Sequence, residues 1–224
     1  VAIDRTGNGA IWAESGNEMN EYTSGLSGSY FRLLDSFGSI REAITTYFGG
    51  VHTISDDNGS HQLNSYDLDG LSSATKSGPD DALLLHSGAD MDPGDAGPMI
   101  QDVDGEYLFV YVHEPYVSPN DRVEFYDVTN PSNVTAVGSP GYIGVSGDVY
   151  SMTADDYYIY AAGDNGSTAT ITVIDIYSKS TPTIARTHSI SGFDRAEAIV
   201  QRGQYLYVFV DNSSGSPKPT LHVY

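Results

Sequence analysis

A weak internal repeat runs through this 224-residue chain and constrains its fold more than any other feature. The unit is an apolar strand, an aromatic strand, a polar turn, a third strand that ends in Tyr or Ile, and one further strand. The clearest copy spans Gly147–Ser189. Repeats with a period of about 20–50 residues are typical of solenoids, propellers and arrays.

Two independent sets of aligned positions give the length of the unit. The second-strand set is Ala10, Val51, Tyr107, Tyr158 and Tyr205, and the third-strand set is Tyr22, Tyr66, Tyr126, Ile174 and Tyr224. Neighbouring members lie 41 to 60 residues apart, which is the length of a four-stranded blade. The strands are rich in Val, Ile, Tyr and Thr and are joined by Asn-Gly turns, while no long window shows a helical stripe.

The repeat predicts an all-β chain that forms a single β-propeller domain over residues 1–224. The five repeats cover about 1–41, 42–97, 98–147, 148–196 and 197–224. A β-sandwich is the alternative, because its short strands and turns look similar, but it does not explain the recurring order of strands. The fifth repeat holds three strands, so we expect an incomplete last blade whose edge at Leu221, His222, Val223 and Tyr224 pairs with another segment or another chain.

Two stretches resemble the LVIVD-repeat β-propellers, namely Val123–Ser139 and Thr172–Ser189. Asp127–Pro131 and Tyr158–Ala162 carry the resemblance best, and it extends over Gly97–Tyr224. The resemblance implies a propeller fold and a secreted or surface-anchored protein of a prokaryote. It implies no particular activity.

The charge of the chain is strongly negative, with 30 acidic and 10 basic residues and a net charge of −20. Such a charge repels itself in dilute salt, and this repulsion is screened when the Debye length falls to about 3 Å at molar salt. An acidic chain with few lysines is typical of a halophilic archaeon or its virus, and an ordinary acidic secreted protein is the alternative. The sequence has no Lys/Arg cluster to neutralise phosphates, which argues against nucleic acid as a partner.

Three absences narrow the possible classes of protein further. The sequence contains no cysteine, so Cys-based metal sites and thiol catalysis are excluded. It has no apolar run of 18 residues, so no membrane-spanning helix is predicted. It also opens without a signal peptide, as expected for a mature or excised product.

Four Asn-x-Ser/Thr sequences are candidate glycosylation sites, at Asn58, Asn133, Asn165 and Asn212. Three of them fall at the same position of the repeat, in the turn between its second and third strands. Asn is also simply a good turn residue, which is the alternative explanation.

Three carboxylates are candidate metal ligands: Asp90, Asp92 and Asp95, within a long departure from the repeat. Oxygen ligands at this spacing can wrap Ca²⁺, although the loop lacks the Gly and Glu positions of an EF-hand. A solvated acidic loop is the alternative.

Catalytic motifs are not evident. The six histidines form no H-x-H or H-E-x-x-H pattern, and no G-x-S-x-G sequence occurs. His113 borders a long turn, and the acids placed near the inner strands are Glu42, Asp102, Asp148 and Glu197. An enzyme would require such acids to cluster with histidine.

The sequence therefore favours an extracellular binding or scaffold propeller that presents loops to a protein or glycan partner. Tyr116 and Tyr142, expected in loops, are the candidate contact residues. One alternative is a structural subunit of a surface layer, filament or virion that assembles with itself through the open blade. The other is a propeller hydrolase or lyase.

Overall fold

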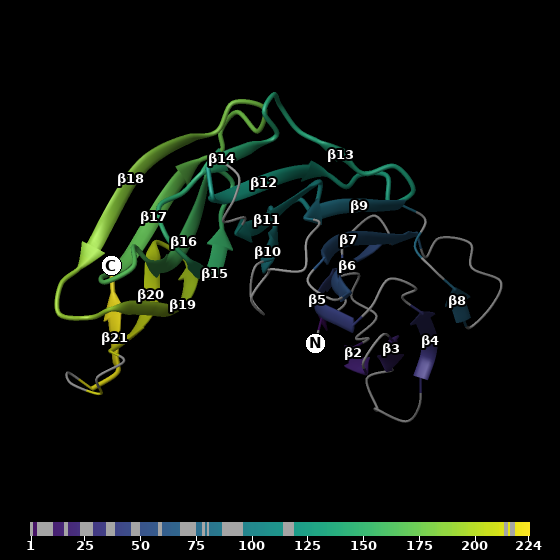
Figure 1. The fold of residues 1–224 in the computed structure, drawn as a ribbon, viewed down its shortest axis with the longest axis horizontal. Helices are drawn as coiled ribbons and strands as arrows, with labels where there is room; N and C mark the ends of the chain where they lie inside the picture. Colours follow the sequence, from purple (N-terminus) through teal and green to yellow (C-terminus); the bar gives the residue numbers. More distant parts are fainter. Residues whose placement is uncertain are drawn as a thin grey trace. The chain divides into compact units, whose positions relative to one another are not determined.

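The computed structural model describes residues 2–3, 11–15, 18–22, 29–34, 39–45, 50–57, 60–67, 75–77, 79, 81–86, 96–113, 119–212, 215 and 218–224. Every regular element in these ranges is a β-strand (Figure 1). The described residues accordingly hold no helix long and apolar enough to cross a membrane. The chain forms two compact units, residues 1–108 with 126–135 and residues 109–125 with 136–224.

The first unit opens with two sheets. The first sheet has the order β1-β2-β3-β4-β8, with strands β1 (Ala2–Ile3), β2 (Ile11–Ser15), β3 (Glu18–Tyr22), β4 (Ser29–Leu34) and β8 (Thr75–Ser77). The second has the order β5-β6-β7-β9, with strands β5 (Ser39–Thr45), β6 (Gly50–Asp57), β7 (Ser60–Asp67) and β9 (Asp81–His86). The pairing of β8 with β4 is parallel and was not predicted, since the repeat contains only antiparallel neighbours.

The second sheet carries the described core of the first unit. Side chains on both faces of its central strands are buried, and the apolar ones are Val51, Ile54, Leu63, Tyr66 and Leu85. Polar side chains are buried beside them, and Asn64 donates a hydrogen bond to Ser55 at 3.1 Å. Nearly every residue of a central strand that is covered on both faces is buried, whereas buried and exposed residues alternate in a strand that is covered on one face.

The third sheet has strands in both units. Its order is β10-β11-β12-β13, and β14 also pairs with β12; the strands are β10 (Ala96–Gln101), β11 (Tyr107–His113), β12 (Asp121–Asp127), β13 (Thr135–Ala136) and β14 (Tyr142–Gly144). The rings of Phe109 and Phe125 meet edge-to-face, with centroids 5.2 Å apart. This edge-to-face arrangement is favourable for aromatic rings, and it stabilises the packing of β11 against β12.

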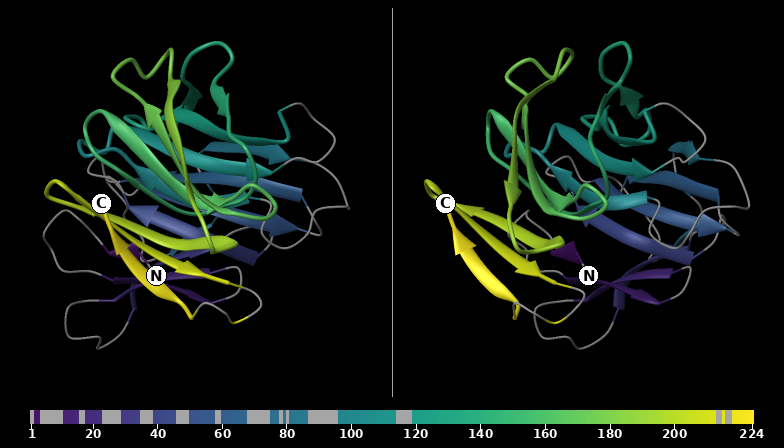
Figure 2. Two further views of the ribbon diagram at one scale, coloured as in Figure 1. Left: turned by 90° about the vertical axis from the view of Figure 1, so that its left-hand side faces the viewer. Right: turned by 60° about the vertical axis from the view of Figure 1, so that its left-hand side comes forward.

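Two further sheets complete the second unit. The fourth has the order β15-β16-β17-β18, with strands β15 (Val149–Ala154), β16 (Tyr158–Asp164), β17 (Ala169–Asp175) and β18 (Thr183–Ile190). The fifth has the order β19-β20-β21, with strands β19 (Arg195–Arg202), β20 (Tyr205–Asp211) and β21 (Thr220–Val223). Figure 2 shows the fifth sheet, in yellow, beside the green fourth sheet in both views.

Small apolar side chains join the fourth and fifth sheets face to face. The buried cluster contains Ala162, Ala169, Ile171, Ile190, Ala196, Ile199, Val208 and Val210. The first strands of the two sheets are also linked, because Ser151 and Thr153 accept hydrogen bonds from the backbone nitrogens of Ile199 and Gln201 at 3.2 and 3.3 Å. Face-to-face contact between consecutive sheets is how neighbouring blades of a propeller pack.

The predicted order of strands is confirmed. The second-strand positions Tyr107, Tyr158 and Tyr205 begin the second strands β11, β16 and β20 of their sheets. The first strands of three sheets share an Ala-Ile pair, at Ala2–Ile3 in β1, Ala43–Ile44 in β5 and Ala198–Ile199 in β19. The described residues form five sheets rather than the two sheets of a sandwich, and three strands are described in the last sheet, as predicted.

Candidate functional site

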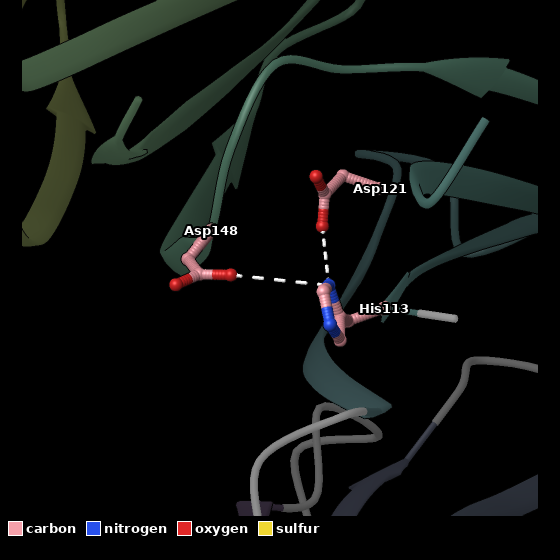
Figure 3. A group of neighbouring side chains, drawn as sticks. All are labelled: His113, Asp121 and Asp148. Atoms are coloured by element: carbon pink, nitrogen blue, oxygen red, sulfur yellow. Dashed lines mark hydrogen bonds and ion pairs between the residues drawn. The ribbon is translucent and has the colours of Figure 1, made fainter. Parts of the chain in front are cut away.

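Three titratable side chains from separate elements converge in the second unit (Figure 3). His113 is the last residue of β11, Asp121 is the first residue of β12, and Asp148 directly precedes β15. Because β11 and β12 are neighbouring strands, the end of the first lies beside the start of the second. From the sequence, His113 and Asp148 were separate candidates and Asp121 was not predicted, since no spacing motif joins the three.

The imidazole of His113 lies between the two carboxylates. Its Nδ1 atom is 2.6 Å from Oδ1 of Asp121 and 4.0 Å from Oδ1 of Asp148. The side chains of His113 and Asp121 are 29% and 17% exposed, and that of Asp148 is 54% exposed. The cluster is therefore anchored on the Asp121 side and open to solvent on the Asp148 side.

The phenol of Tyr111 orients both carboxylates. Its hydroxyl lies 3.0 Å from Oδ1 of Asp121 and 3.4 Å from Oδ1 of Asp148, and its ring is buried. Burial, with the charges of Asp121 and Asp148 and the hydrogen bond to Asp121, raises the pKa of Tyr111 far above its usual range, although a backbone hydrogen bond with Val149 acts in the opposite sense. The phenol is consequently a hydrogen-bond donor at every pH at which the protein would be studied.

Close backbone packing places Asp148. The preceding Gly147 has φ +81°, and a Cβ there would lie 2.0 Å from the carbonyl oxygen of Asp164. A Cβ on Gly163, across the β15–β16 pair, would lie 1.8 Å from the carbonyl oxygen of Asp148. Both glycines permit this approach, which delivers the Asp148 side chain to His113.

The three donor atoms offer one imidazole nitrogen and two carboxylate oxygens, all within 4.8 Å of one another. Such a set can act as an ion-paired histidine held by two acids, or as three ligands of a cation. Of the acids predicted near the inner strands, the structure brings Asp148 to a histidine. Glu197 instead lies 3.8 Å from Arg195, Asp102 accepts a hydrogen bond from the Tyr107 backbone at 3.1 Å, and the side chain of Glu42 lies outside the described residues.

Five of the predicted site residues lie outside the described ranges. The candidate calcium ligands Asp90, Asp92 and Asp95, the glycosylation candidate Asn58 and the contact candidate Tyr116 all lie outside the described residues. These remain predictions.

The other three glycosylation candidates lie at or near the surface. Asn133 and Asn165 are exposed, and Asn165 sits in the turn between β16 and β17. Asn212 is half-buried, and its Nδ2 donates to the carbonyl of Gly192 at 3.2 Å. A side-chain amide that makes this hydrogen bond is a poorer glycosylation acceptor than the exposed amides of Asn133 and Asn165.

The expectation that Tyr142 lies in a loop is wrong. Tyr142 begins strand β14, where it pairs with Glu124, and the Arg122 guanidinium lies 5.7 Å above its ring. The ring is half-buried, so much of its surface already contacts the protein itself. The loop was predicted because the segment around Tyr142 is rich in Gly, Ser and Pro, which favour turns.

A second notable surface lies on the fifth sheet. Two rows of paired residues cross its outer face, Val200–Tyr207–Val223 and Ala198–Phe209–Leu221. Leu221 and Val223 are 58% and 54% exposed, and Val200, Phe209 and Tyr205 are exposed as well. Within the described residues, the predicted edge strand β21 pairs with β20 on one side and with no strand on the other.

No model of a known protein family matches the chain, and no curated protein matches it. Among solved structures, the chain is similar to a WD40-type β-propeller in a crystal structure of the mitotic checkpoint complex, with a TM-score of 0.67 and 11% sequence identity. The match covers the whole of this chain but 62% of the other. A likeness at this identity shows the fold and no more, and the fold is a β-propeller.

Proposed function

We propose that the protein is a binding module that docks a protein segment on the open fifth sheet. The observation that supports this most strongly is an exposed apolar face on the same sheet as a strand edge that pairs with no other described strand. Exposed sheet edges receive added strands, with backbone hydrogen bonds supplying affinity and alternate side chains supplying specificity. Large exposed apolar patches also mark interaction sites.

The hydrogen-bond register of β21 identifies the atoms available to a partner. Leu206 and Tyr224 exchange both backbone hydrogen bonds at 3.0 Å, so their pair is a hydrogen-bonded one. Because such pairs alternate along an antiparallel ladder, the pairs Tyr207–Val223 and Phe209–Leu221 are non-hydrogen-bonded. The backbone groups of Leu221 and Val223 therefore point away from β20, toward the open edge, where an added strand pairs.

The charge of this part of the chain indicates the character of the partner. After Asp175 the sequence has five basic and three acidic residues, a net charge of +2, whereas the residues up to Asp175 carry −22. Complementary charge steers association and suppresses wrong partners. The partner segment is therefore extended, apolar at alternate positions and acidic overall.

A peptide display library of extended segments tests the proposal. Enriched peptides are expected to be acidic with alternating apolar residues, and to lose binding to the Leu221→Pro variant, which removes one outward N–H without touching the β20–β21 hydrogen bonds. Asp156→Pro, in the exposed turn between β15 and β16, is the control for a surface proline. Enrichment of peptides that bind Leu221→Pro equally well overturns the proposal, and self-association lost in Leu221→Pro identifies a second copy as the partner.

We also propose an extracellular, salt-rich setting and membership of the LVIVD-repeat propellers. The net charge of −20, the exposed acceptors Asn133 and Asn165, and the segment Asp127–Pro131 support these assignments. Intact-mass measurement of the protein from its native source tests the first, because glycans on the acceptors require a secretory route. Unmodified Asn133 and Asn165 would count against it.

A further inference from the structure

We propose that Nδ1 of His113, together with one carboxylate oxygen each from Asp121 and Asp148, binds a divalent transition-metal ion of the Zn²⁺ and Mn²⁺ class. The site is independent of the binding surface on the fifth sheet. It rests on the convergence of three donors from three elements that are separated in the sequence by 8 and 27 residues (Figure 3).

The spacing of the donors suits a single ion. A metal about 2.0–2.2 Å from each ligand atom places those atoms roughly 3–3.5 Å apart. The observed Nδ1–Oδ1 distances of 2.6 Å to Asp121 and 4.0 Å to Asp148 lie on either side of this value. An ion that replaces the proton between His113 and Asp121 requires these two groups to separate, and the exposed Asp148 side chain to approach, each by roughly 0.5–1 Å.

The charges of the cluster favour a cation between the donors. Asp121 and Asp148 are both within reach of one point, and like charges so close raise each other's energy unless a positive charge lies between them. In the described part of the chain, His113 alone forms a salt bridge with either acid. The neighbouring Arg122 is directed to Glu124, with Nε 2.7 Å from its carboxylate.

The chemistry of the donors selects the class of metal. Ca²⁺ takes six to eight oxygen ligands, so a site built on an imidazole nitrogen is a poor match for it. One imidazole and two carboxylates suit Zn²⁺, Mn²⁺ and related ions. The 54% exposure of Asp148 leaves room for water to complete the coordination sphere.

Tyr111 supplies the outer contacts that such a site requires. Its buried hydroxyl lies within hydrogen-bonding distance of both ligand oxygens, at 3.0 and 3.4 Å. Outer hydrogen bonds of this kind fix the orientation of ligating carboxylates. A bound ion would tie the β11–β12 hairpin to the start of β15, a cross-link in a chain that contains no cysteine.

Calorimetric titration of chelator-treated protein with ZnCl₂, MnCl₂ and CaCl₂, with Tm measured in parallel, tests the proposal. We expect one saturable Zn²⁺ or Mn²⁺ equivalent that the Asp148→Asn variant binds at least about tenfold more weakly. At a hundredfold excess over Kd the Tm should rise by about 5–10 °C. Asp156→Asn, an exposed acid away from the cluster, is the matched control and should bind as the unaltered protein does.

The contrary results are equally clear. No saturable heat and no Tm shift with Zn²⁺ or Mn²⁺ would overturn the proposal. Equal affinity in Asp148→Asn and in His113→Gln, compared with Asp156→Asn, would also overturn it, because the metal would then bind elsewhere, such as at the Asp90–Asp95 segment. Asp148→Asn is isosteric, His113→Gln is a polar change of similar size, and both side chains are partly exposed, so a folded protein is expected in each case.

Discussion

His113 and Asp121 close the turn end of the β11–β12 pair, with Nδ1 of the imidazole 2.6 Å from Oδ1 of the carboxylate. A contact this short between a ring nitrogen and a carboxylate oxygen is a charge-assisted hydrogen bond, which is stronger than a neutral one. The same oxygen lies 3.0 Å from the hydroxyl of Tyr111, so one atom of Asp121 serves two donors. The folded state should depend on this small network.

Removal of the Tyr111 hydroxyl measures that dependence. Tyr111→Phe keeps the buried ring but deletes the hydrogen bonds to Asp121 and Asp148, so we expect a loss of about 1.5–3 kcal/mol in the free energy of unfolding. Tyr177→Phe is the control, because its ring is 80% exposed, and should change stability by less than about 0.5 kcal/mol. Urea unfolding measures both, and similar values for the two variants would show that the phenol is not a structural part of the cluster.

The close approach of β16 to Asp148 makes a second prediction. In Gly163→Ala the new methyl group would meet the carbonyl oxygen of Asp148, so we expect a loss of about 3 kcal/mol or more. Gly166→Ala has open space around the new Cβ but a φ of +90°, and should cost about 1–2 kcal/mol from backbone strain alone. Chemical unfolding separates the two causes. Equal losses would mean that β15 and β16 move apart at little cost.

His52 predicts a pH dependence of stability. Burial lowers the pKa of His52 to about 4, and its ring is fully buried. The unfolded chain takes up a proton near the ordinary value of 6.5 and the folded chain near 4. His52 therefore leaves the free energy of unfolding unchanged above pH 6.5. As the pH falls from 6.5 toward 4, it lowers that free energy by on the order of 3 kcal/mol.

The variant His52→Leu isolates this effect from the titration of the acids. The variant replaces the imidazole with an apolar side chain of similar size. It also removes the two buried ring nitrogens, neither of which has a hydrogen-bond partner among the described residues. Unfolding curves between pH 7 and 4 should show a shallower decline for the variant than for the unaltered protein. Parallel declines would mean that the His52 ring gains access to water when it is protonated.

The net charge of −20 predicts that salt stabilises the protein. Most of the gain should appear between about 0.01 and 0.5 M NaCl, because the Debye length falls from roughly 30 Å to below 5 Å over this range. A gain confined to higher concentrations would point instead to the general effect of salt on apolar burial. Thermal unfolding across the series distinguishes the two, and equal stability throughout would remove the halophilic assignment.

The order and positions of the strands were largely predictable. Aromatic segments such as Tyr158–Tyr160 and apolar pairs such as Ala198–Ile199 recur at the same places in the repeat, and they form the second and first strands of their sheets. Strand propensity and alternation are local properties, so a repeat expresses them in every copy. The three described strands of the last sheet were predicted for the same reason.

The parallel pairing of Thr75–Ser77 with β4 and the strand that contains Tyr142 were not predictable in this way. Both segments are short, and their pairing partners lie far along the chain or beyond a Gly-rich turn. Local preference is too weak in two or three residues to outweigh the neighbouring turn residues, so the available edge of a sheet decides the outcome.

The sequence by itself determined that the described residues form an all-β structure of five successive sheets, because residue types with the same local preferences recur in each copy of the repeat. Only the tertiary structure decided that His113, Asp121 and Asp148 share one point in space. That convergence depends on the closure of the β11–β12 pair and on the room left by Gly147 and Gly163. Distances between segments follow from how backbones pack against one another, and no spacing along the chain encodes them.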